Sequence, residues 1–437
     1  MSQINQVKEA IDIVDIIASR LDLKQSGSSF KGLCPFHSEK SPSFFVNPQL
    51  QRYRCFGCGA KGDVYDFLQQ YEGMSFYEAL QFLADQAGIK LEQFSKTKDD
   101  DLREQLLEIL QLSAKYYHYL LTQHQAGKKA RNYLDDRGIH LSSIELFQIG
   151  YALSAWDGLL NFLNKKKGFN LDVIEKTGLI IRNNSGRYYD RFRDRVVFPL
   201  KNHRGQIVGF SGRVLAQEDP VQPQPKYINT PETMLYHKAK TLYGYSENYQ
   251  EIRKKNEVIV CEGEFDVISS QQVHVKQIVA IKGSALTLEQ AKLLERSVER
   301  VIITLDSDEA GIKATKRAIE IVGDTNLDLR VIDLSSIDSS TEFQDVDQLA
   351  QSNPQLWKKV AKSSVSAYEF LMEVSLRKHD LNSAQGRRKI VDELAPVFKN
   401  ISHEVEKDFY LKKLAERMNL TVGTLLKDCL LYTSDAA

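Results

Sequence analysis

The chain opens with an amphipathic helical pattern. Residues 4–23 repeat apolar side chains at the spacing of one helix face, among them Ile4, Val7, Ile11 and Val14. Short β-prone stretches such as SFFVN and QRYRCF follow, and then two helical stretches that begin with capping residues. This pattern predicts a small unit in which short strands pack against helices.

Four further patterns follow along the chain. Residues 106–160 have a helical pattern, and residues 178–215 carry strand-like stretches such as GLIIR, DRVVFPL and GQIVGFSGRVL. From residue 257, the strand-like stretches EVIVC, QIVAI, RVIITL and LRVIDL alternate with helical ones. This alternation predicts a parallel sheet with right-handed crossovers. Residues 365–428 return to a helical pattern with short breaks.

Composition is typical of a soluble protein with several domains. The 437 residues are too many for one ordinary core, and 42% hydrophobic with 27% charged residues is a globular balance. No apolar run approaches the ~18 residues of a membrane helix, and the N-terminus lacks an apolar signal core. The five cysteines are few and odd in number, which indicates a reducing compartment. We therefore expect a cytoplasmic protein of two to four domains with no membrane partner.

The formal net charge of zero hides two oppositely charged segments. Residues 182–240 hold 11 Lys and Arg against 5 Asp and Glu, whereas residues 257–350 hold 9 against 18. The first segment therefore suits an anionic partner, and the second suits cations.

Four potential metal ligands stand in two close pairs near the N-terminus. Two residues separate Cys34 from His37, two separate Cys55 from Cys58, and 17 residues lie between the pairs. Zinc prefers tetrahedral sites of thiolate and imidazole, and a site filled by four protein ligands is structural. We predict one structural zinc ion here. The alternative is that the four residues are unrelated and buried for other reasons.

The segment between the two pairs interleaves cations with aromatic rings. Cations hold phosphates and exposed rings stack on bases, which is the physics of single-strand binding. We assign Arg52 and Tyr53 to such a surface. Phe44 and Phe45 are explained equally well as part of the core of a small domain.

Carboxylates gather where the predicted parallel strands end. Binding groups collect beyond the carboxyl ends of such strands, and crowded carboxylates repel one another unless a cation compensates. Oxygen ligands suit Mg²⁺ or Mn²⁺, and two such ions can assist phosphoryl transfer. The alternative is that these acids are helix caps and exposed turn residues. The acids concerned are Glu262, Asp266, Asp306, Asp308, Asp345 and Asp347.

The basic segment alternates cations with tyrosines. Each cation that neutralises a phosphate releases counterions, so binding here is expected to weaken as the salt concentration rises. The alternative for any one of these residues is a solvated surface position. The cations are Arg187, Arg191, Arg193, Arg195, Arg213, Lys226, Lys238 and Lys240, and the tyrosines are Tyr188, Tyr189, Tyr227 and Tyr236.

These motifs together resemble those of the bacterial DnaG-type DNA primases. CPFHSEKSPSF and YRCFGCGAKGD resemble the zinc-binding domain of that family. YDRFRDRVVFPL, GFSGRVL and PKYINTPET resemble the basic half of its polymerase domain. CEGEFDVIS and TLDSDEAG resemble a Toprim fold, which topoisomerases and some nucleases share. The motifs occur in order from residue 1 to about residue 350.

The resemblance implies a multidomain α+β fold. It consists of an N-terminal zinc ribbon, a mixed α/β polymerase domain that contains a Toprim parallel-sheet subdomain, and a C-terminal helical subdomain. The expected segments are 1–95 for the zinc-binding domain, 96–110 for a linker, 111–255 for the basic N-terminal subdomain of the RNA polymerase domain, 256–350 for the Toprim catalytic subdomain, 351–430 for the helical subdomain and 431–437 for a tail that continues no recognisable pattern.

The resemblance also implies an activity and a set of site residues. The family is a group of nucleotidyltransferases that synthesise short RNA primers from NTPs on single-stranded DNA and cooperate with the replicative helicase. All six acids would be catalytic, with Mg²⁺ or Mn²⁺ held by Glu262, Asp306 and Asp308. The residues of the template or nucleotide track would be Arg195, Arg213, Lys226, Tyr227 and Lys238.

Three further expectations concern the partners and one unusual acid. We expect a monomer, and we expect the C-terminal helicase-binding domain of the family to be absent because the sequence ends at residue 437. Glu264 stands where the family usually carries an aromatic residue. Its side chain either faces solvent or adds charge to the site.

Two other functions compete with primase. A Toprim topoisomerase or nuclease would share the acids, but a topoisomerase needs a nucleophilic tyrosine in a further large domain. In a non-catalytic, zinc-dependent single-strand binder the cluster of carboxylates would have no function, which counts against this alternative. Incorporation of labelled NTPs on a primer-free single-stranded template distinguishes primase from both.

Overall fold

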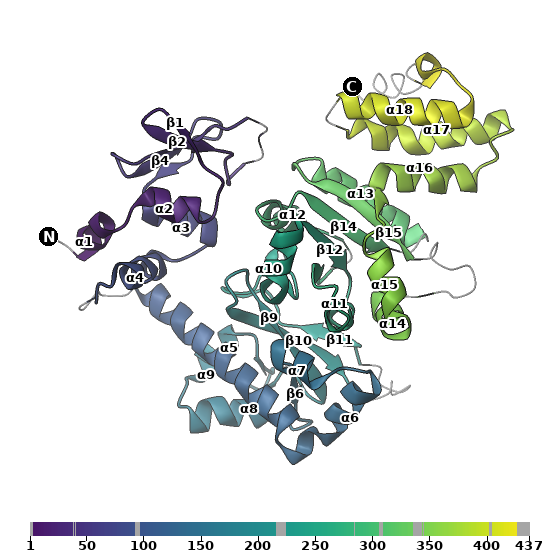
Figure 1. Ribbon diagram of the computed structural model, residues 1–437. Coiled ribbons are helices and arrows are strands. Elements are labelled where there is room, and N and C mark those ends of the chain that lie inside the picture. The colour runs from purple at the N-terminus through teal and green to yellow at the C-terminus, as the bar shows by residue number, and fades with distance from the viewer. Residues whose placement is uncertain are drawn as a thin grey trace. The chain divides into compact units, whose positions relative to one another are not determined.

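Figure 1 shows the computed structural model. It describes residues 3–37, 39, 41–91, 97–215, 224–283, 285–305, 309–334, 343, 345–401 and 404–425. The chain forms two compact units, Met1–Glu108 and Ile109–Ala437. Across the described part of the chain, every helix is too short or too polar to cross a membrane.

The first unit is a small antiparallel sheet with helices, as the sequence predicts. Its strand order is β1-β2-β3-β4-β5. The Ser75–Glu78 capping box expected from the sequence is present at the start of α4, and Asp63 with Asp66 forms another at α3. The elements are α1 (Gln3–Ala10), α2 (Ile13–Ala18), β1 (Lys24–Ser26), β2 (Ser29–Gly32), β3 (Phe44–Asn47), β4 (Arg52–Cys55), β5 (Lys61–Gly62), α3 (Val64–Glu72) and α4 (Phe76–Ala87).

A long helix, α5 (Lys98–Thr122), begins where the sequence predicts a linker. Residues 98–110 form its first half, and the boundary between the two compact units falls inside it. The charged residues of this stretch therefore belong to helical turns. Asp99, Asp100 and Asp101 lie in the first turn, where the helix dipole favours acids.

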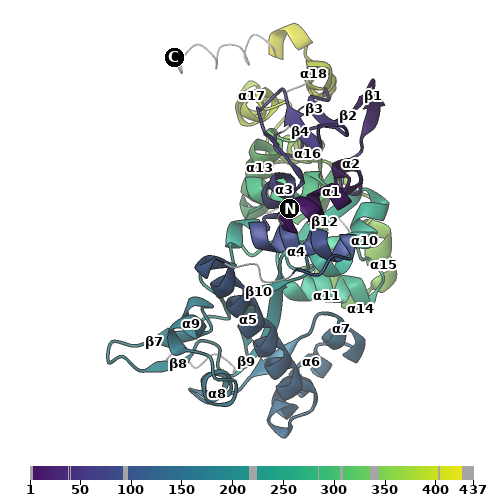
Figure 2. The ribbon, with the colours of Figure 1, turned by 90° about the vertical axis from the view of Figure 1, so that its left-hand side faces the viewer.

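The second unit begins with a four-stranded antiparallel sheet of order β11-β10-β9-β6 and a separate hairpin of β7 and β8. Figure 2 shows this hairpin beside α8 and α9. The elements are η1 (Gln125–Gly127), α6 (Lys128–Asp136), α7 (Leu141–Leu146), β6 (Gly150–Ala152), α8 (Gly158–Asn161), η2 (Phe162–Lys166), α9 (Leu171–Lys176), β7 (Ile180–Arg182), β8 (Tyr188–Asp190), β9 (Arg195–Lys201), β10 (Ile207–Val214), β11 (Tyr227–Asn229), η3 (Lys238–Lys240) and α10 (Tyr245–Lys255).

A second sheet in this unit has the order β13-β12-β14-β15-β16. The first four strands are parallel, which confirms the prediction from the β-α alternation, and β16 adds an antiparallel edge. The elements are β12 (Glu257–Cys261), α11 (Glu264–Gln272), β13 (Ile278–Ala280), α12 (Leu288–Glu295), β14 (Arg300–Leu305), α13 (Glu309–Val322), β15 (Asp328–Asp333), α14 (Val346–Ser352), α15 (Pro354–Val360) and β16 (Val365–Ser366).

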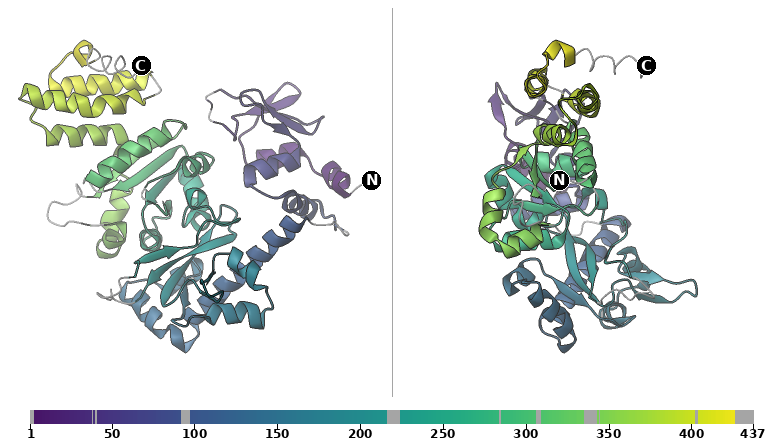
Figure 3. Two further views of the ribbon diagram at one scale, coloured as in Figure 1. Left: turned by 180° about the vertical axis from the view of Figure 1, so that it is seen from behind. Right: turned by 90° about the vertical axis from the view of Figure 1, so that its right-hand side faces the viewer.

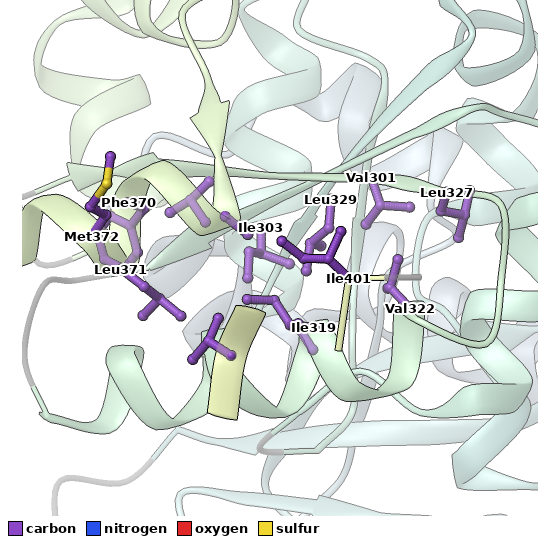
Figure 4. Close-up of a cluster of buried hydrophobic side chains, with 14 of the residues drawn as sticks. Val301, Ile303, Ile319, Val322, Leu327, Leu329, Phe370, Leu371, Met372 and Ile401 are labelled. Carbon is purple, nitrogen blue, oxygen red and sulfur yellow. The ribbon is translucent and has the colours of Figure 1, made fainter. Parts of the chain in front are cut away.

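The C-terminal helices share their core with this parallel sheet. They are α16 (Ala367–Lys378), α17 (Ala384–Lys399) and α18 (Glu404–Met418). α16 lies against α13 and β15, as the two opposite views in Figures 1 and 3 show. In Figure 4, Val301 and Leu329 of the sheet lie in one buried cluster with Ile319 of α13 and Phe370 of α16. The helical region is therefore packed on the sheet by burial of apolar surface.

Candidate active site and zinc centre

The four predicted zinc ligands come together in the first unit. Their ligand atoms all lie within 4.8 Å of one another. The Sγ atoms of Cys34 and Cys58 are 3.8 Å apart, and Nδ1 of His37 is 3.8 Å from Sγ of Cys55. Two thiolates bound to zinc in a tetrahedron at the usual bond length lie ~3.8 Å apart, so this set fits one ion.

Close packing around the ligands requires a glycine at position 57. A Cβ atom on Gly57 would lie 2.5 Å from Nε2 of His37, which is closer than real Cβ atoms approach. The tight turn between Cys55 and Cys58 can therefore hold its ligands against His37 only with glycine at this position.

Glu39 and Ser43 support the ligands, and the sequence reasoning missed both. Glu39 accepts hydrogen bonds from the backbone N–H of Cys34 at 2.8 Å and of Ser43 at 3.0 Å, and its carboxylate lies 3.4 Å from Nε2 of His37. The Ser43 hydroxyl lies 3.1 Å from Sγ of Cys55. A carboxylate on the far nitrogen of a ligating histidine fixes the ring and raises its basicity. Because Glu39 lies between the two pairs of ligands in the sequence, its position could have indicated that it supports the zinc site.

The exposed face of the ribbon sheet carries cations, but Tyr53 is not on it. Arg52 is exposed, whereas Tyr53 is 1% exposed and stacks on Phe44 at 5.2 Å between ring centroids. The expectation that Tyr53 lies on a binding surface is therefore wrong, because neither face of its ring is free for a base. Phe44 is a core residue, and Phe45 is partly buried.

A cavity of about 460 Å³ in the second unit brings the acidic and basic segments together. Its wall combines the strand ends of the parallel sheet with β10 and β11 of the antiparallel sheet. The charged and polar residues that line it are Arg137, Arg213, Lys226, Tyr227, Asn229, Glu262, Glu264, Asp266, Lys282, Thr304, Asp345 and Asp347.

Among the described residues, the acids reach this cavity from the connections that follow β12 and β15. Glu262 comes directly after β12 and is exposed, and Asp266 lies in the first turn of α11. Asp345 caps the N-terminus of α14 by accepting a hydrogen bond from the backbone N–H of Gln348 at 2.8 Å. Asp306 and Asp308 lie outside the described residues, although they follow β14, which pairs with β12 in parallel.

Asp266 links the segment that follows β12 to the start of α14. Its carboxylate accepts hydrogen bonds from the backbone N–H groups of Gly263 and Asp347, both at 2.9 Å. Burial and then repulsion from Asp345 raise the pKa of Asp266 to about 7. Carboxylates this crowded favour a cation that offsets their repulsion. The donor set thus fits a divalent metal ion.

Asp347 has a different environment from the other acids. It is buried and pairs with Arg137 at 3.0 Å, and its other oxygen accepts hydrogen bonds from Ser269 and Gln351. The Arg137 guanidinium also lies over the ring of Phe265, 4.5 Å from its centroid. Sequence reasoning missed Arg137, because its partner is 210 residues away.

The basic wall is centred on Arg213 and Tyr227, which face each other on β10 and β11. Arg213 donates a hydrogen bond to the Tyr227 hydroxyl at 2.9 Å. Lys226 is exposed beside them, and Lys238 lies near Gly283 of the cavity wall. Within the described residues, Arg213 and Lys226 have no carboxylate partner.

Arg195, in contrast, does not face the cavity. It is 3% exposed and donates hydrogen bonds to the backbone carbonyls of Gly212 at 3.1 Å and Pro225 at 3.0 Å. Burial lowers the pKa of its guanidinium. The prediction that Arg195 contacts nucleic acid disagrees with this placement. Arg195 instead ties β10 to the segment that leads into β11.

Glu264, which the sequence left unexplained, neither faces solvent nor adds net charge to the acids. It forms a buried ion pair with Lys282. Lys282 was not among the predicted residues, because nothing in its surrounding sequence indicates a buried partner.

Family models match most of the chain in order. The CHC2 zinc finger matches residues 1–99, and the N-terminal domain of the DNA primase catalytic core matches residues 116–249. A Toprim-like model matches residues 259–349. The DnaB-helicase binding domain of primase matches residues 368–423. The expectation that a helicase-binding domain is absent is therefore wrong.

Curated relatives decide the family. The DNA primase of Halalkalibacterium halodurans is 37% identical over 430 residues, which cover 97% of this chain and 70% of that protein. The chain belongs to the bacterial DnaG-type DNA primases. The DNA primase of Geobacillus stearothermophilus is 36% identical over 428 residues, covering 97% of this chain and 70% of that protein. This primase is accordingly a nucleotidyltransferase that polymerises RNA.

Solved primase structures agree with this assignment. The zinc-binding and RNA polymerase domains of the Aquifex aeolicus primase match with a TM-score of 0.63 and 29% identity, covering 98% of this chain and 99% of that one. A DnaG primase catalytic domain bound to single-stranded DNA also matches, with a TM-score of 0.63 and 28% identity, covering 74% of this chain and 99% of that one. The alternatives of topoisomerase, nuclease and non-catalytic binder receive no support.

Proposed function

We propose that this primase joins NTPs on a single-stranded DNA template in the cavity between its acidic and basic sheets. A nucleotide 3′-hydroxyl gives up its proton to solvent and attacks the α-phosphate of the incoming NTP in line. The new bond forms between the 3′-oxygen and the α-phosphorus, the bond from that phosphorus to the bridging oxygen breaks, and pyrophosphate leaves with its electrons. The observation that carries this proposal is that one cavity contains both Arg213, Lys226 and Tyr227 and the acids of the parallel sheet.

The acids are proposed as the metal-binding wall. Glu262, Asp306 and Asp308 would hold Mg²⁺ or Mn²⁺, and Asp266 and Asp345 line the same cavity as Glu262. A bound divalent cation supplies positive charge for the oxygens that enter and leave at phosphorus. Asp266 keeps the loop after β12 and the start of α14 together through its two hydrogen bonds. Asp347 contributes by holding Arg137 at the cavity.

The basic wall is proposed as the nucleotide and template track. Arg213 is held by a tyrosine hydroxyl, so its charge is available to a triphosphate. Lys226 directly precedes Tyr227, and Lys238 lies near Gly283, which follows Lys282. Both lysines are exposed and add positive charge to this wall. Cations of this kind lose affinity for nucleic acid as the salt concentration rises.

The first test addresses Arg213. Arg213→Ala removes a charge-assisted phosphate contact, so the KM for NTP is expected to rise about 10- to 100-fold while zinc content and thermal stability change little. Arg253→Ala, an exposed position on α10 outside the cavity, is the matched control and is expected to leave KM unchanged. Equal KM values for the two variants would refute the nucleotide role of Arg213.

The zinc ribbon is proposed as a second contact with the template. Pairing across its strands aligns Lys31, Phe45, Arg54 and Lys61 in one row, and Arg52 lies on the same exposed side of β4 as Arg54. Phe56 is 64% exposed, and its ring lies 4.9 Å from the Arg54 guanidinium. A row of cations and rings suits a single strand.

The C-terminal helices are proposed to bind the replicative helicase at the replisome in the bacterial cytoplasm. Their match to a helicase-binding domain supports this partner. Val405 and Phe409 lie one turn apart on α18 and are 86% and 55% exposed, so they offer apolar surface for a partner to cover.

A further inference from the structure

One buried ion pair forms part of the cavity wall but has no part in the proposed chemistry. Glu264 begins α11, and Lys282 follows β13. Their side chains are only 2% and 5% exposed. Lys282 also donates a hydrogen bond to the hydroxyl of Ser211, a buried residue of β10, at 3.2 Å. Removing two charges from water is costly, so stability alone gives little reason to place such a pair here.

The ammonium group of Lys282 lies between the two walls of the cavity. On the basic side, Ser211 is two residues before Arg213, so both side chains lie on the same face of β10. On the acidic side, Glu264 is two residues before Asp266 in the first turn of α11. Lys282 thus joins the strand that carries a nucleotide-binding cation to the helix that carries a catalytic acid.

The ring of Tyr227 connects the ion pair directly to Arg213. The ammonium of Lys282 lies 5.8 Å from the centroid of this ring, and the guanidinium of Arg213 lies 5.2 Å from it. The Tyr227 hydroxyl accepts the hydrogen bond from Arg213. Two cations therefore lie within cation–π distance of one ring, and each is attracted to it.

The charge of Glu264 is matched within the pair. The Glu264 carboxylate pairs with the Lys282 ammonium, which also donates a hydrogen bond to Ser211.

We propose that the Glu264–Lys282 pair is a positioning device for nucleotide binding. It fixes Tyr227 and Arg213 at a set distance from Asp266, and so determines how tightly the triphosphate of an incoming NTP is held. This inference rests on the proposed role of Arg213. Glu264 and Lys282 touch neither phosphate nor metal and act through Ser211, Tyr227 and Arg213.

The test is a double-mutant cycle read by steady-state kinetics and thermal melting. Lys282→Met leaves Glu264 buried without its partner, so both the Tm and the affinity for NTP are expected to fall. The double variant Glu264→Gln with Lys282→Met removes both charges and keeps the volumes, so its Tm is expected to return to within about 3 °C of the parent protein. Its KM for NTP is expected to stay raised about tenfold, with kcat changed less than about threefold.

A second, partly buried pair provides the control. Lys201 of β9 and Glu247 of α10 are 2.8 Å apart and 14% and 7% exposed, but they do not line the cavity. Lys201→Met is expected to lower the Tm without changing KM. The inference is overturned if the double variant regains the parent KM together with its Tm, or if Lys201→Met raises KM as much. If Arg213→Ala leaves KM unchanged in the same assay, the proposed role of Arg213 fails instead.

Discussion

The zinc centre shows how residues that bind no metal shape a metal site. Glu39 receives two backbone N–H groups and faces the far nitrogen of His37, so it orders the loop that holds Cys34 and His37. Burial would raise the pKa of Glu39, but hydrogen bonds from the side chain and backbone of Ser43 hold it below its usual value. The carboxylate is thus ionised and able to orient the imidazole.

Replacing this carboxylate tests its role in zinc binding. Glu39→Gln keeps the side-chain shape but removes the charge, so zinc affinity is expected to fall about 10- to 100-fold, as for other carboxylates that support ligands. Competition with a coloured chelator measures this. Glu9→Gln, an exposed position on α1, is the control. Identical chelator curves for the two variants would show that Glu39 does not support the site.

The exposure of an individual residue could be predicted where the alternation of a strand indicates which face the residue lies on. The β4 residues Arg52 to Cys55 alternate exposed and buried, so the ligand Cys55 places Tyr53 on the inner face and Arg52 on the outer one. That alternation would have assigned Tyr53 to the core. Lys282 and Arg137 could not be found this way, because their acidic partners come from other elements and only the fold brings them together.

At the scale of elements, strand ends and helix starts position the acids. β12 and β14 pair in parallel, Glu262 comes directly after β12, and the first turn of α11 brings Asp266 to the N-terminus of α14. The β-α alternation of the sequence predicted the parallel strands that these acids follow. It did not predict the antiparallel strand β16 or the helical stretch at 98–105, since short and highly charged segments carry weak periodicity.

Among the C-terminal helices, one acid connects α16 to α17. Glu393 of α17 accepts hydrogen bonds from Lys378, His379 and Ser375, at 3.0, 3.1 and 2.9 Å. Although burial opposes it, these partners, with Lys378 foremost, lower the pKa of Glu393 to about 2. A carboxyl whose pKa is lower in the folded protein stabilises it above the unfolded pKa. That contribution disappears as the pH falls from about 4.5 to about 2.

This linkage gives a pH-dependent prediction. Glu393→Gln is expected to lower the free energy of unfolding by about 1 kcal/mol at pH 7, a value that allows for solvent screening of a partly exposed group. The difference from the parent protein is expected to shrink toward zero at about pH 2. Denaturant titrations at several pH values measure it. Glu404→Gln, 87% exposed on α18, should show no such trend, and a pH-independent difference for Glu393→Gln would contradict the linkage.

At the scale of the whole molecule, basic and acidic residues occupy separate segments of the sequence, and the fold brings residues of both segments into one cavity. The basic residues 182–240 supply β9, β10 and β11, and the acidic residues 257–350 supply the parallel sheet. Both contribute to one cavity, which is where a polyanionic substrate and a divalent cation would be required together. We propose that RNA is polymerised in this cavity.

Incorporation of labelled NTPs on primer-free single-stranded DNA tests that claim most directly. Glu262 is exposed in the cavity at the carboxyl end of β12, and Glu257 lies at the other end of the same strand, paired with Arg300. Loss of a metal-binding carboxylate predicts that Glu262→Gln makes at least about 100-fold less RNA with unchanged zinc content and Tm, while Glu257→Gln keeps its activity. Normal RNA synthesis by folded Glu262→Gln would contradict the account.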